Sequence, residues 1–373
     1  MDRLSRIVFT VSVFVIALLF CVDRTANAWD IQVVEPYRYV GGWSSIAIDA
    51  NNRPHISYDN FYRLKYASWN GSAWVVETID SVGDTGHRSS LTLDQQGRPH
   101  ISYIDTQNNL HYATKNGAEW QTNIIDQSFY HSIAVDANGN PSILYSSSGE
   151  LRLRSWDGTS WMISTVDTFE DRGSGCASIA IDNIGITHIS YYDLGSEKLK
   201  YAKWNGTSWD LQVIADVISN DGENTLKLDV NGNPHITYYD GRDTSLKYAT
   251  WDGLSWVIET VDAEQEAGRY HSLALDGNGN PYISYYRQDE YVRRDTSLWF
   301  ASRNGSTWQK VLVDSGAGGI GIYNSLALDS RGNPYISYLD DSNYLIKVAT
   351  VPEPSTVLAL FFGIGGIIWQ RRK

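Results

Sequence analysis

The chain has 373 residues, of which 42% are hydrophobic and 20% charged, and its 14 Trp and 24 Tyr exclude a disordered or fibrous protein. Its formal net charge of −13 argues against nucleic acid as a partner, because binding to phosphate groups needs a basic surface. Two Cys in a chain of this length exclude a disulfide-rich scaffold.

The first 28 residues have the pattern of a secretory signal peptide. Two arginines precede a continuous apolar run from Ile7 to Val22, and Ala26–Ala28 forms a small-x-small cleavage site. We therefore expect signal peptidase to remove residues 1–28, so that the mature chain begins at Trp29. A buried helix is the alternative, and the polar break after the apolar run argues against it.

Residues 29–350 contain seven copies of one unit, which recurs every 42 to 53 residues. Each unit reads approximately SLALDxxGNPxISYYD, then LKYATWDG, then SWxxETVD, and it holds four runs of period-two alternation separated by turn residues. Four short antiparallel strands at this period are typical of a β-propeller blade. The first strands of the seven units are expected to begin at Ser45, Ser90, Ser132, Ser178, Thr225, Ser272 and Ser325.

The strands of a unit differ in composition, and this predicts their places in a blade. Small residues alternate with Ile or Leu in the first strand, which suits the innermost position near the propeller axis. A tight turn such as Asp136–Pro141 leads to the second strand. The third and fourth strands are joined by a turn bracketed by Trp, as in Trp251–Trp256. We expect these Trp pairs to fill the wide outer gaps between blades.

The ends of the repeat region predict how the ring closes. The seventh unit stops at Thr350, before a fourth strand, whereas Trp29–Glu35 matches the fourth strand of the fourth unit, Trp209–Ala215, almost residue for residue. Segment 29–35 should therefore pair with the third strand of the last unit near Lys347. The sequence predicts an all-β fold: one seven-bladed β-propeller domain, residues 29–350, with four antiparallel strands per blade, closed by an N-terminal strand.

Residues 351–373 form a second targeting segment, which starts with Val351, Pro352, Glu353 and Pro354 and continues with an apolar stretch and an Arg-Arg-Lys end. This order resembles the PEP-CTERM sorting signal, which exosortase reads in Gram-negative bacteria that export polysaccharide. The resemblance implies export, transient anchoring in the inner membrane by a transmembrane segment, and cleavage near Pro352 to Pro354. The protein would then be periplasmic, at the cell surface or secreted. A permanent anchor is the alternative, and the short apolar stretch argues against it.

The Trp-bracketed turns resemble the Asp-box of sialidase-type propellers, and the closest instance is Ser155–Trp161, which is one residue shorter before its Gly. The resemblance implies a structural role, since Asp-boxes brace the fold away from the active face. Sialidase chemistry also needs three arginines around a carboxylate. Arg88 and Arg269 precede first strands, but no third Arg has an equivalent place. We therefore do not expect a sialidase.

Two further patterns could suggest a metal ion. Four histidines share one position on the second strand, but they lie on different blades, so we expect hydrogen bonds to first-strand Asp residues such as Asp49 or Asp229 instead: His55, His100, His188 and His235. The Asp-x-Asn-Gly-Asn-Pro loops resemble calcium loops, but they lack a later bidentate carboxylate. We expect plain hairpin turns there, and we predict no metal and no cofactor.

Residues that depart from the repeat are the candidates for function. They lie before the first strands, in what we expect to be loops on one face, together with Glu223 and an insertion from Gln288 to Thr296. The candidate ligand-binding residues are Tyr130, His131, Tyr270, His271, Arg88, Arg269 and Tyr323. Aromatic rings mixed with His and Arg suit stacking on sugars or holding a protein loop. A solvated rim without a ligand is the alternative.

Three functions fit these features. The first is a noncatalytic, exported propeller that binds extracellular polysaccharide or a surface protein. The second is a glycosidase or lyase on the loop face, for which Glu223, Asp240 and Glu290 are the candidate carboxylates. The third is a multivalent lectin that resembles sugar-binding propellers, with sites between blades lined by the repeated Trp and Tyr.

Overall fold

The computed structural model describes residues 29–36, 42–60, 63–80, 85–169, 174–219, 223–264, 266–288 and 295–351. Of the described residues, Gln32–Val348 form one compact unit, and 29–31 with 349–351 belong to a second. The predicted signal peptide, 1–28, and the tail from residue 352 onward lie outside the described residues. Within the described ranges, no helix has the length and hydropathy needed to cross a membrane.

Seven four-stranded antiparallel sheets make up the fold, as predicted. Blade 1 contains β2 (Ser44–Ile48), β3 (Pro54–Asp59), β4 (Leu64–Trp69) and β5 (Trp74–Asp80), and blade 2 contains β6 (Thr85–Leu93), β7 (Pro99–Asp105), β8 (Asn109–Asn116) and β9 (Glu119–Gln127). Blade 3 contains β10 (His131–Val135), β11 (Pro141–Ser147), β12 (Glu150–Trp156) and β13 (Trp161–Thr168), and blade 4 contains β14 (Ser174–Ile181), β15 (Thr187–Asp193), β16 (Lys198–Trp204) and β17 (Trp209–Asp216). Blade 5 contains β18 (Asn224–Leu228), β19 (Pro234–Asp240), β20 (Ser245–Trp251) and β21 (Trp256–Asp262), and blade 6 contains β22 (Ala267–Leu275), β23 (Pro281–Gln288), β24 (Asp295–Asn304) and β25 (Thr307–Ala317). Blade 7 contains β26 (Ile320–Leu328), β27 (Pro334–Asp340), β28 (Leu345–Thr350) and β1 (Asp30–Val33).

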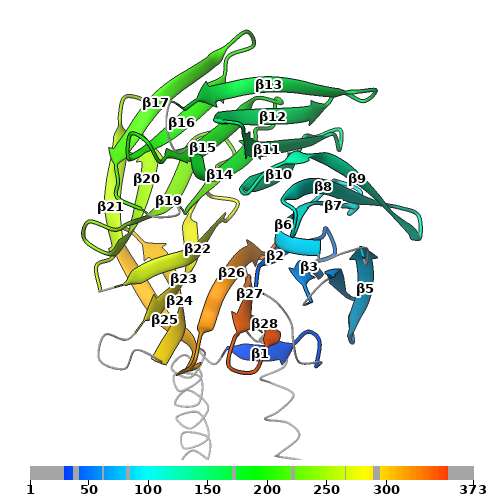
Figure 1. Cartoon of the computed structure of the whole chain (residues 1–373). Coiled ribbons are helices and arrows are strands. Elements are labelled where there is room, and N and C mark those ends of the chain that lie inside the picture. The colour runs from blue at the N-terminus through cyan, green and yellow to red at the C-terminus, as the bar shows by residue number, and fades with distance from the viewer. Residues whose placement is uncertain are drawn as a thin grey trace, which may run out of the picture. The chain divides into compact units, whose positions relative to one another are not determined.

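The first strand of each blade is innermost, as its small residues predicted. Figure 1 shows β2, β6, β10, β14, β22 and β26 nearest the centre of the ring of blades. Together with β18, these strands contact one another in ring order and surround a channel of about 400 Å³. Their Ser hydroxyls bond to the next blade: the Leu91 N–H donates to Ser45 Oγ at 3.0 Å, and the Ile46 N–H donates to Ser325 Oγ at 3.2 Å. Small side chains are therefore needed both for space and for these bonds.

The N-terminal strand closes the ring, as predicted. β1 is the outer strand of the seventh sheet, next to β28, and the Val34 N–H donates to the Ile346 carbonyl at 3.0 Å. Glu35 then accepts a hydrogen bond from the buried Tyr58 hydroxyl of blade 1 at 2.9 Å. Five other blade boundaries have an equivalent bond from a second-strand Tyr to a fourth-strand Asp, such as Tyr103 to Asp80. Glu35 thus provides this hydrogen bond at the boundary between blades 7 and 1, where the two ends of the propeller meet.

The turn after each first strand is a hairpin turn, as expected. In all seven turns the first Asp accepts hydrogen bonds at Oδ1 from the backbone N–H groups two and four residues later: Asp49, Asp94, Asp136, Asp182, Asp229, Asp276 and Asp329. These carboxylates stabilise the turn itself.

The four repeated histidines lie beside these turns and face the expected Asp residues, but only His188 makes the expected hydrogen bond. The Nε2 atoms of His55 and His100 are buried without a hydrogen-bond partner. The distance from His Nε2 to Asp Oδ2 is 3.4 Å for His188 and 4.0 Å for His235. Each ring also bonds through Nδ1 to the hydroxyl of a third-strand Tyr, as His100 does to Tyr112 at 2.7 Å. This Tyr partner was not predicted from the sequence.

The Trp residues fill the outer gaps between blades, as expected. In the turn of blade 5, Trp251 and Trp256 meet edge to face, with ring centroids 5.5 Å apart. Trp256 also packs on Tyr201 of the preceding blade at 5.2 Å. The same contact joins Tyr66 to Trp120, Tyr112 to Trp161 and Tyr248 to Trp308.

Candidate functional site

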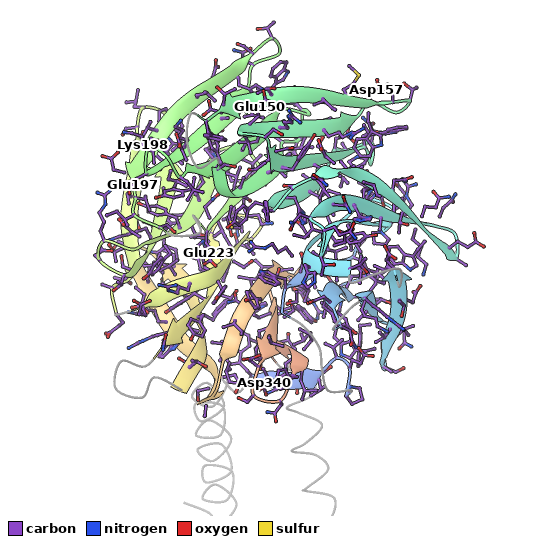
Figure 2. All side chains as sticks on the ribbon, viewed as in Figure 1. Glu150, Asp157, Glu197, Lys198, Glu223 and Asp340 are labelled. Atoms are coloured by element: carbon purple, nitrogen blue, oxygen red, sulfur yellow. The ribbon has the colours of Figure 1, made fainter. Side chains whose placement is uncertain are left out.

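One residue from each blade lies at the end of the channel where the innermost strands begin. It stands two positions before the Ser or Thr of the first strand, and we call the set the mouth ring: Trp43, Arg88, Tyr130, Cys176, Glu223, Tyr270 and Tyr323. The next residues along the chain, such as His131 and Asn224, already line the channel. In Figure 2 Glu223 lies toward the centre of the ring of blades, whereas Asp157, in an outer Trp turn, lies at its periphery.

Three members of the mouth ring have an uncommon backbone conformation. Arg88, Tyr270 and Tyr323 have φ angles of 55°, 49° and 51°, in the left-handed region. In each case the residue two positions earlier in the chain is a Gly with φ between 88° and 106°. Each also adjoins two register shifts in the pairing of the first strand with the second. Such bulges re-aim side chains, and left-handed φ at a non-Gly residue costs about 1–3 kcal/mol.

These segments were expected to be loops, and that expectation was wrong. The residues belong to β6, β22 and β26, which begin at Thr85, Ala267 and Ile320, several residues before the predicted starts. The bulges interrupt the alternation of polar and apolar residues, so the period-two pattern could not be followed into them. A rigid, hydrogen-bonded strand therefore holds these mouth-ring residues.

The mouth ring brings together side chains from five blades. The Arg88 guanidinium carbon lies 5.0 Å from the Trp43 ring centroid and 4.6 Å from that of Tyr130. The Trp43 and Tyr323 centroids are 4.3 Å apart, and those of Tyr323 and Tyr270 are 4.7 Å apart. We call these five residues the aromatic array. All five are partly exposed, so the array offers ring faces and a cation to a ligand.

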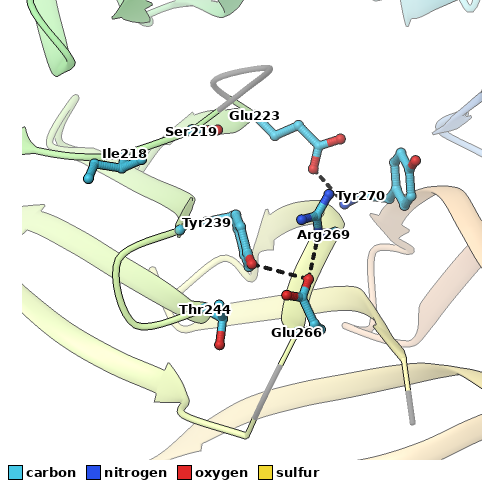
Figure 3. A pocket seen from close by; sticks show the side chains of 9 residues that line it. Ile218, Ser219, Glu223, Tyr239, Thr244, Glu266, Arg269 and Tyr270 are labelled. Carbon is cyan, nitrogen blue, oxygen red and sulfur yellow. Dashed lines mark hydrogen bonds and ion pairs between the residues drawn. The ribbon is translucent and has the colours of Figure 1, made fainter. Parts of the chain in front are cut away.

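A cavity of about 160 Å³ adjoins the array between blades 5 and 6 (Figure 3). Tyr239, Glu266 and Arg269 form one of its walls: the Arg269 Nε–H donates to Glu266 Oε2 at 2.9 Å, and the Tyr239 hydroxyl donates to the same oxygen at 3.3 Å. Glu223 accepts a hydrogen bond from the Tyr270 N–H at 2.6 Å. The cavity therefore combines two carboxylates, a guanidinium and two phenols.

Burial and neighbouring charges together shift the pKa values of Arg269 and Tyr239 in this cavity. Burial opposes the charged form of Arg269, but the adjacent Glu266 and Tyr239 outweigh it and raise the pKa of Arg269. Burial, followed by the charge of Glu266, raises the pKa of Tyr239. Tyr239 is therefore a protonated hydrogen-bond donor at neutral pH. The arrangement suits hydrogen bonding to a polar ligand.

Four of the seven predicted ligand-binding residues meet in the aromatic array: Arg88, Tyr130, Tyr270 and Tyr323. Arg269 lies in the adjacent cavity, with its guanidinium carbon 5.1 Å from the Tyr239 ring centroid. Trp43, Tyr239 and Glu266 were not predicted from the sequence. Trp43 could have been found because it stands two positions before Ser45, like the others. Tyr239 and Glu266 carry no such signal, since they depend on how two blades pack.

The two predicted histidines occupy a layer below the mouth ring. His131 Nδ1 lies 2.8 Å from Ser102 Oγ of the preceding blade, and His271 Nδ1–H donates to the Gly268 carbonyl at 2.8 Å. Burial, followed by the charge of Arg88, lowers the pKa of His131 to about 3. Asn224 and Asn324 stand at the same position and bond to Ser190 and Ser284. The structure thus places both histidines in contacts that stabilise the blades.

Two of the three candidate carboxylates of an enzyme, Glu223 and Asp240, lie within the described residues, and they do not line the same cavity. Glu223 lines the cavity described above, whereas Asp240 is not among its lining residues and accepts a hydrogen bond from the Arg242 N–H at 3.1 Å. Glu290 lies outside the described residues, as does most of the insertion. In the outer turn of Ser155–Trp161, Asp157 accepts bonds from the Thr159 and Ser160 N–H groups, which makes it a turn brace.

Comparison with known proteins identifies the fold. No protein-family model matches the chain, and no curated protein resembles it in sequence. An ulvan lyase of family PL25, solved with a glucuronate and sulfated-rhamnose repeat, superposes with a TM-score of 0.63 at 14% identity, covering 87% of this chain and 96% of the lyase.

Two lectins are also similar in structure. The SapL1 lectin, solved with α-methyl fucoside, gives a TM-score of 0.54 at 15% identity, covering 74% of this chain and 97% of the lectin. The fucose-specific lectin of Aleuria aurantia gives 0.53 at 17% identity, covering 74% and 96%. At these identities the likeness establishes the propeller fold and leaves the function to the residues of the site.

Proposed function

We propose that this protein is a noncatalytic propeller that binds extracellular polysaccharide at the channel mouth. One observation carries the proposal: three bulged strands hold Arg88, Tyr270 and Tyr323 in left-handed φ so that they join Trp43 and Tyr130 in one array. Strained residues that the surrounding structure holds in place often mark binding sites. The lectin and lyase neighbours, which bind sugars, are consistent with this ligand class.

The chemistry of the mouth indicates the kind of polysaccharide. Ring faces stack on the apolar faces of pyranoses, and the array presents such faces from four aromatic residues. Arg88 and Arg269 add two guanidinium groups, which bind carboxylate or sulfate groups through paired hydrogen bonds. We therefore expect a polysaccharide that contains uronate or sulfate groups to bind better than a neutral one.

The experiment measures binding of the purified full chain to a glycan array and to exopolysaccharide from the producing bacterium. Trp43→Ala and Tyr270→Ala should each weaken binding at least tenfold, because each removes a stacking surface at the centre of the array. Trp251→Ala, in an outer turn of blade 5, is the matched control and should leave affinity unchanged. Full binding by folded mouth variants would refute the proposed site, and absence of any glycan ligand would refute the function.

We also propose that the protein acts outside the cytoplasm. The support is the sequence of its two ends: a signal peptide over 1–28 and a tail over 351–373 that resembles a PEP-CTERM sorting signal. Signal peptidase and exosortase would be the processing partners, with the inner membrane as a transient anchor. Intact mass spectrometry of exported protein tests this, since a retained 361–369 peptide would contradict removal of the tail.

A polysaccharide lyase is the second candidate, favoured by the cavity that gathers Glu223, Glu266, Arg269 and Tyr239. A lyase must abstract a proton next to a uronate carboxylate, and Arg269 could neutralise that carboxylate. The raised pKa of Tyr239 argues against it as the base. Incubation with uronate polysaccharides distinguishes the two functions, because a lyase would generate the ultraviolet absorbance of unsaturated uronate, whereas a binding protein would not.

A further inference from the structure

Blade 3 departs from the way the other blades fill their outer interior. In the other six blades, one position of the second strand carries a ring: His55, His100, His188, His235, Tyr282 and Tyr335. The first four bond to a third-strand Tyr, and Tyr282 stacks on Phe300 with centroids 5.9 Å apart. These ring pairs occupy the space between the first-strand turn and the outer Trp of the next blade.

Three positions of blade 3 are truncated together. Ser142 replaces the second-strand ring, Leu153 replaces the third-strand Tyr, and Ser164 stands where blades 1, 4 and 5 have Glu77, Gln212 and Glu259. Ser142 bonds to Ser155 on the neighbouring strand, with 2.9 Å between the hydroxyl oxygens, so it stays close to the sheet. All three truncations face the boundary with blade 4.

A pocket of about 390 Å³ opens at this boundary. Ser142, Leu153 and Ser164 all line it, together with Asp136, Asn140, Ser155, Thr187, and the rings of Trp156, Trp204 and Trp209. The volume is within the range of about 300–1,000 Å³ typical of small-ligand sites. The pocket therefore occupies the space that the absent side chains would fill.

The truncations also remove the partner of a buried donor. Trp120, Trp256 and Trp308 donate through Nε1–H to Glu77, Gln212 and Glu259 at 3.0–3.2 Å. The Ser164 side chain is too short to accept the equivalent hydrogen bond from Trp209. The indole Nε1 of Trp209 is buried without a hydrogen-bond partner in the structure. An unsatisfied buried N–H costs about 1–3 kcal/mol.

The boundary between blades 7 and 1 provides a comparison. There Val348 replaces the third-strand Tyr, and the Nε1 of Trp74 is likewise buried without a partner. However, Tyr335 keeps the second-strand ring and packs, with Trp74, against the core cluster that contains Val348. One truncation is thus compensated by a neighbouring ring. Blade 3 has three truncations and no ring at either position.

We propose that the pocket between blades 3 and 4 is a second binding site, for a single neutral pyranose residue. Trp156 and Trp204 provide ring faces for its apolar side, while Asp136, Asn140 and the Ser and Thr hydroxyls bond to its hydroxyl groups. Met162 and Ile163, exposed to 58% and 56%, also line the pocket and add apolar surface at its outer side. The carboxylate of Asp136 disfavours an anionic sugar.

This site is independent of the mouth ring, so its test is separate. The probes are methyl glycosides of common neutral hexoses and 6-deoxyhexoses, with binding to the full chain followed by saturation-transfer NMR and titration calorimetry. At least one probe should bind the unaltered protein. The double variant Ser142→His with Leu153→Tyr restores the residues of the other blades and fills the pocket. It should weaken binding at least tenfold and leave the melting temperature unchanged or higher.

A second variant keeps the test decisive if the double variant does not fold. Ser164→Gln restores the acceptor that Gln212 provides to Trp256, and it should weaken binding while raising stability. Tyr270→Ala, at the mouth, is the control and should leave binding of these probes unchanged. Full binding by a folded, filled variant would overturn the proposal, and so would failure of every probe to bind the unaltered protein at millimolar concentration. If the mouth variants lose polysaccharide binding but still bind the methyl glycosides, the result supports two separate sites.

Discussion

The two ends of the innermost strands are built on opposite plans. At the turn end, seven Asp residues accept the same pair of backbone hydrogen bonds, and the blades differ little. At the mouth end, four strands are bulged and three mouth-ring residues have left-handed φ. The mouth ring has Tyr in three blades and four other residue types in the remaining four. At the turn end the Asp carboxylates bond to the backbone of their own turn, whereas at the mouth Arg88 and the aromatic side chains pack on one another and are partly exposed.

This contrast shows where a repeat protein can change without loss of its fold. Residues that satisfy buried backbone groups are restrained in all seven blades, because each missing bond costs stability. The mouth and the boundary of blades 3 and 4 depart from the repeat, and both of them carry accessible aromatic surface and hydrogen-bonding groups. Departures from the repeat are therefore the best guide to function in this protein.

The largest loss of stability is expected from opening the ring of blades, on which both the turn end and the mouth end depend. Deletion of residues 29–35 removes β1, exposes the edge of β28 and leaves the buried Tyr58 hydroxyl without Glu35. The free energy of unfolding should fall by on the order of 5 kcal/mol or more. Calorimetry and denaturant titration measure it.

A loop exchange is the control for this deletion. Replacing residues 289–294 by a two-residue Asn-Gly turn alters a similar length of chain between β23 and β24 without touching the closure. It should cost far less than the deletion. Equal melting temperatures for the two variants would contradict closure by β1.

The second prediction tests how tightly the bulges are packed. Gly268 has φ +106°, and a Cβ there would lie 2.6 Å from Leu246 Cβ, whereas Gly253 has φ +101° with no atom within 4 Å of its Cβ position. Gly268→Ala should destabilise by about 3 kcal/mol and weaken ligand binding, because strain and overpacking add. Gly253→Ala carries the φ strain alone and should cost about 1 kcal/mol. Similar losses of unfolding free energy would show that packing does not hold the bulge.

The sequence predicted the regular part of this structure well, and physical reasons explain the rest. Blades, closure by residues 29–35 and the pairing of His55 with Asp49 follow from a pattern repeated up to seven times. The bulges at the mouth occur in four blades and disrupt the alternation that reveals strands. Contacts such as Tyr239 with Arg269 join neighbouring blades, and a single sequence carries no signal for such a pairing. The truncations at Ser142 and Leu153 were visible, but their meaning depends on the cavity between blades.

The third prediction concerns pH, and it sharpens the view that His131 is structural. Burial lowers its pKa to about 3, below the 6.5 of an exposed histidine. The unfolded chain therefore binds more protons between these values, so the stability from His131 is complete above pH 6.5 and is lost as pH falls toward 3. At pH 5 the loss is about 2 kcal/mol.

His131→Asn is the matched variant for this prediction. Asn224 and Asn324 already occupy the equivalent position and bond to the preceding blade, so the fold should be retained. Melting curves between pH 7.5 and 5 should show a smaller loss of stability for the variant than for the unaltered protein. Other buried histidines whose pKa values are lowered by burial, such as His100 and His188, will keep part of the slope. An unchanged slope would mean that His131 is protonated in the folded protein.

The smallest effect is expected at the mouth itself, where Tyr270 has φ 49°. Tyr270→Ala removes the ring but keeps a Cβ in the left-handed conformation, whereas Tyr270→Gly removes both the ring and the strain. Since both variants lose the same contacts with Tyr323 and Tyr286, the difference between them isolates the strain. The Gly variant should be the more stable by about 1 kcal/mol, even though Gly normally weakens a strand. Both variants should lose polysaccharide binding equally, because binding depends on the ring. If the Ala variant is as stable as the Gly variant, the backbone at the mouth stores no strain, and the array is held by side-chain packing alone.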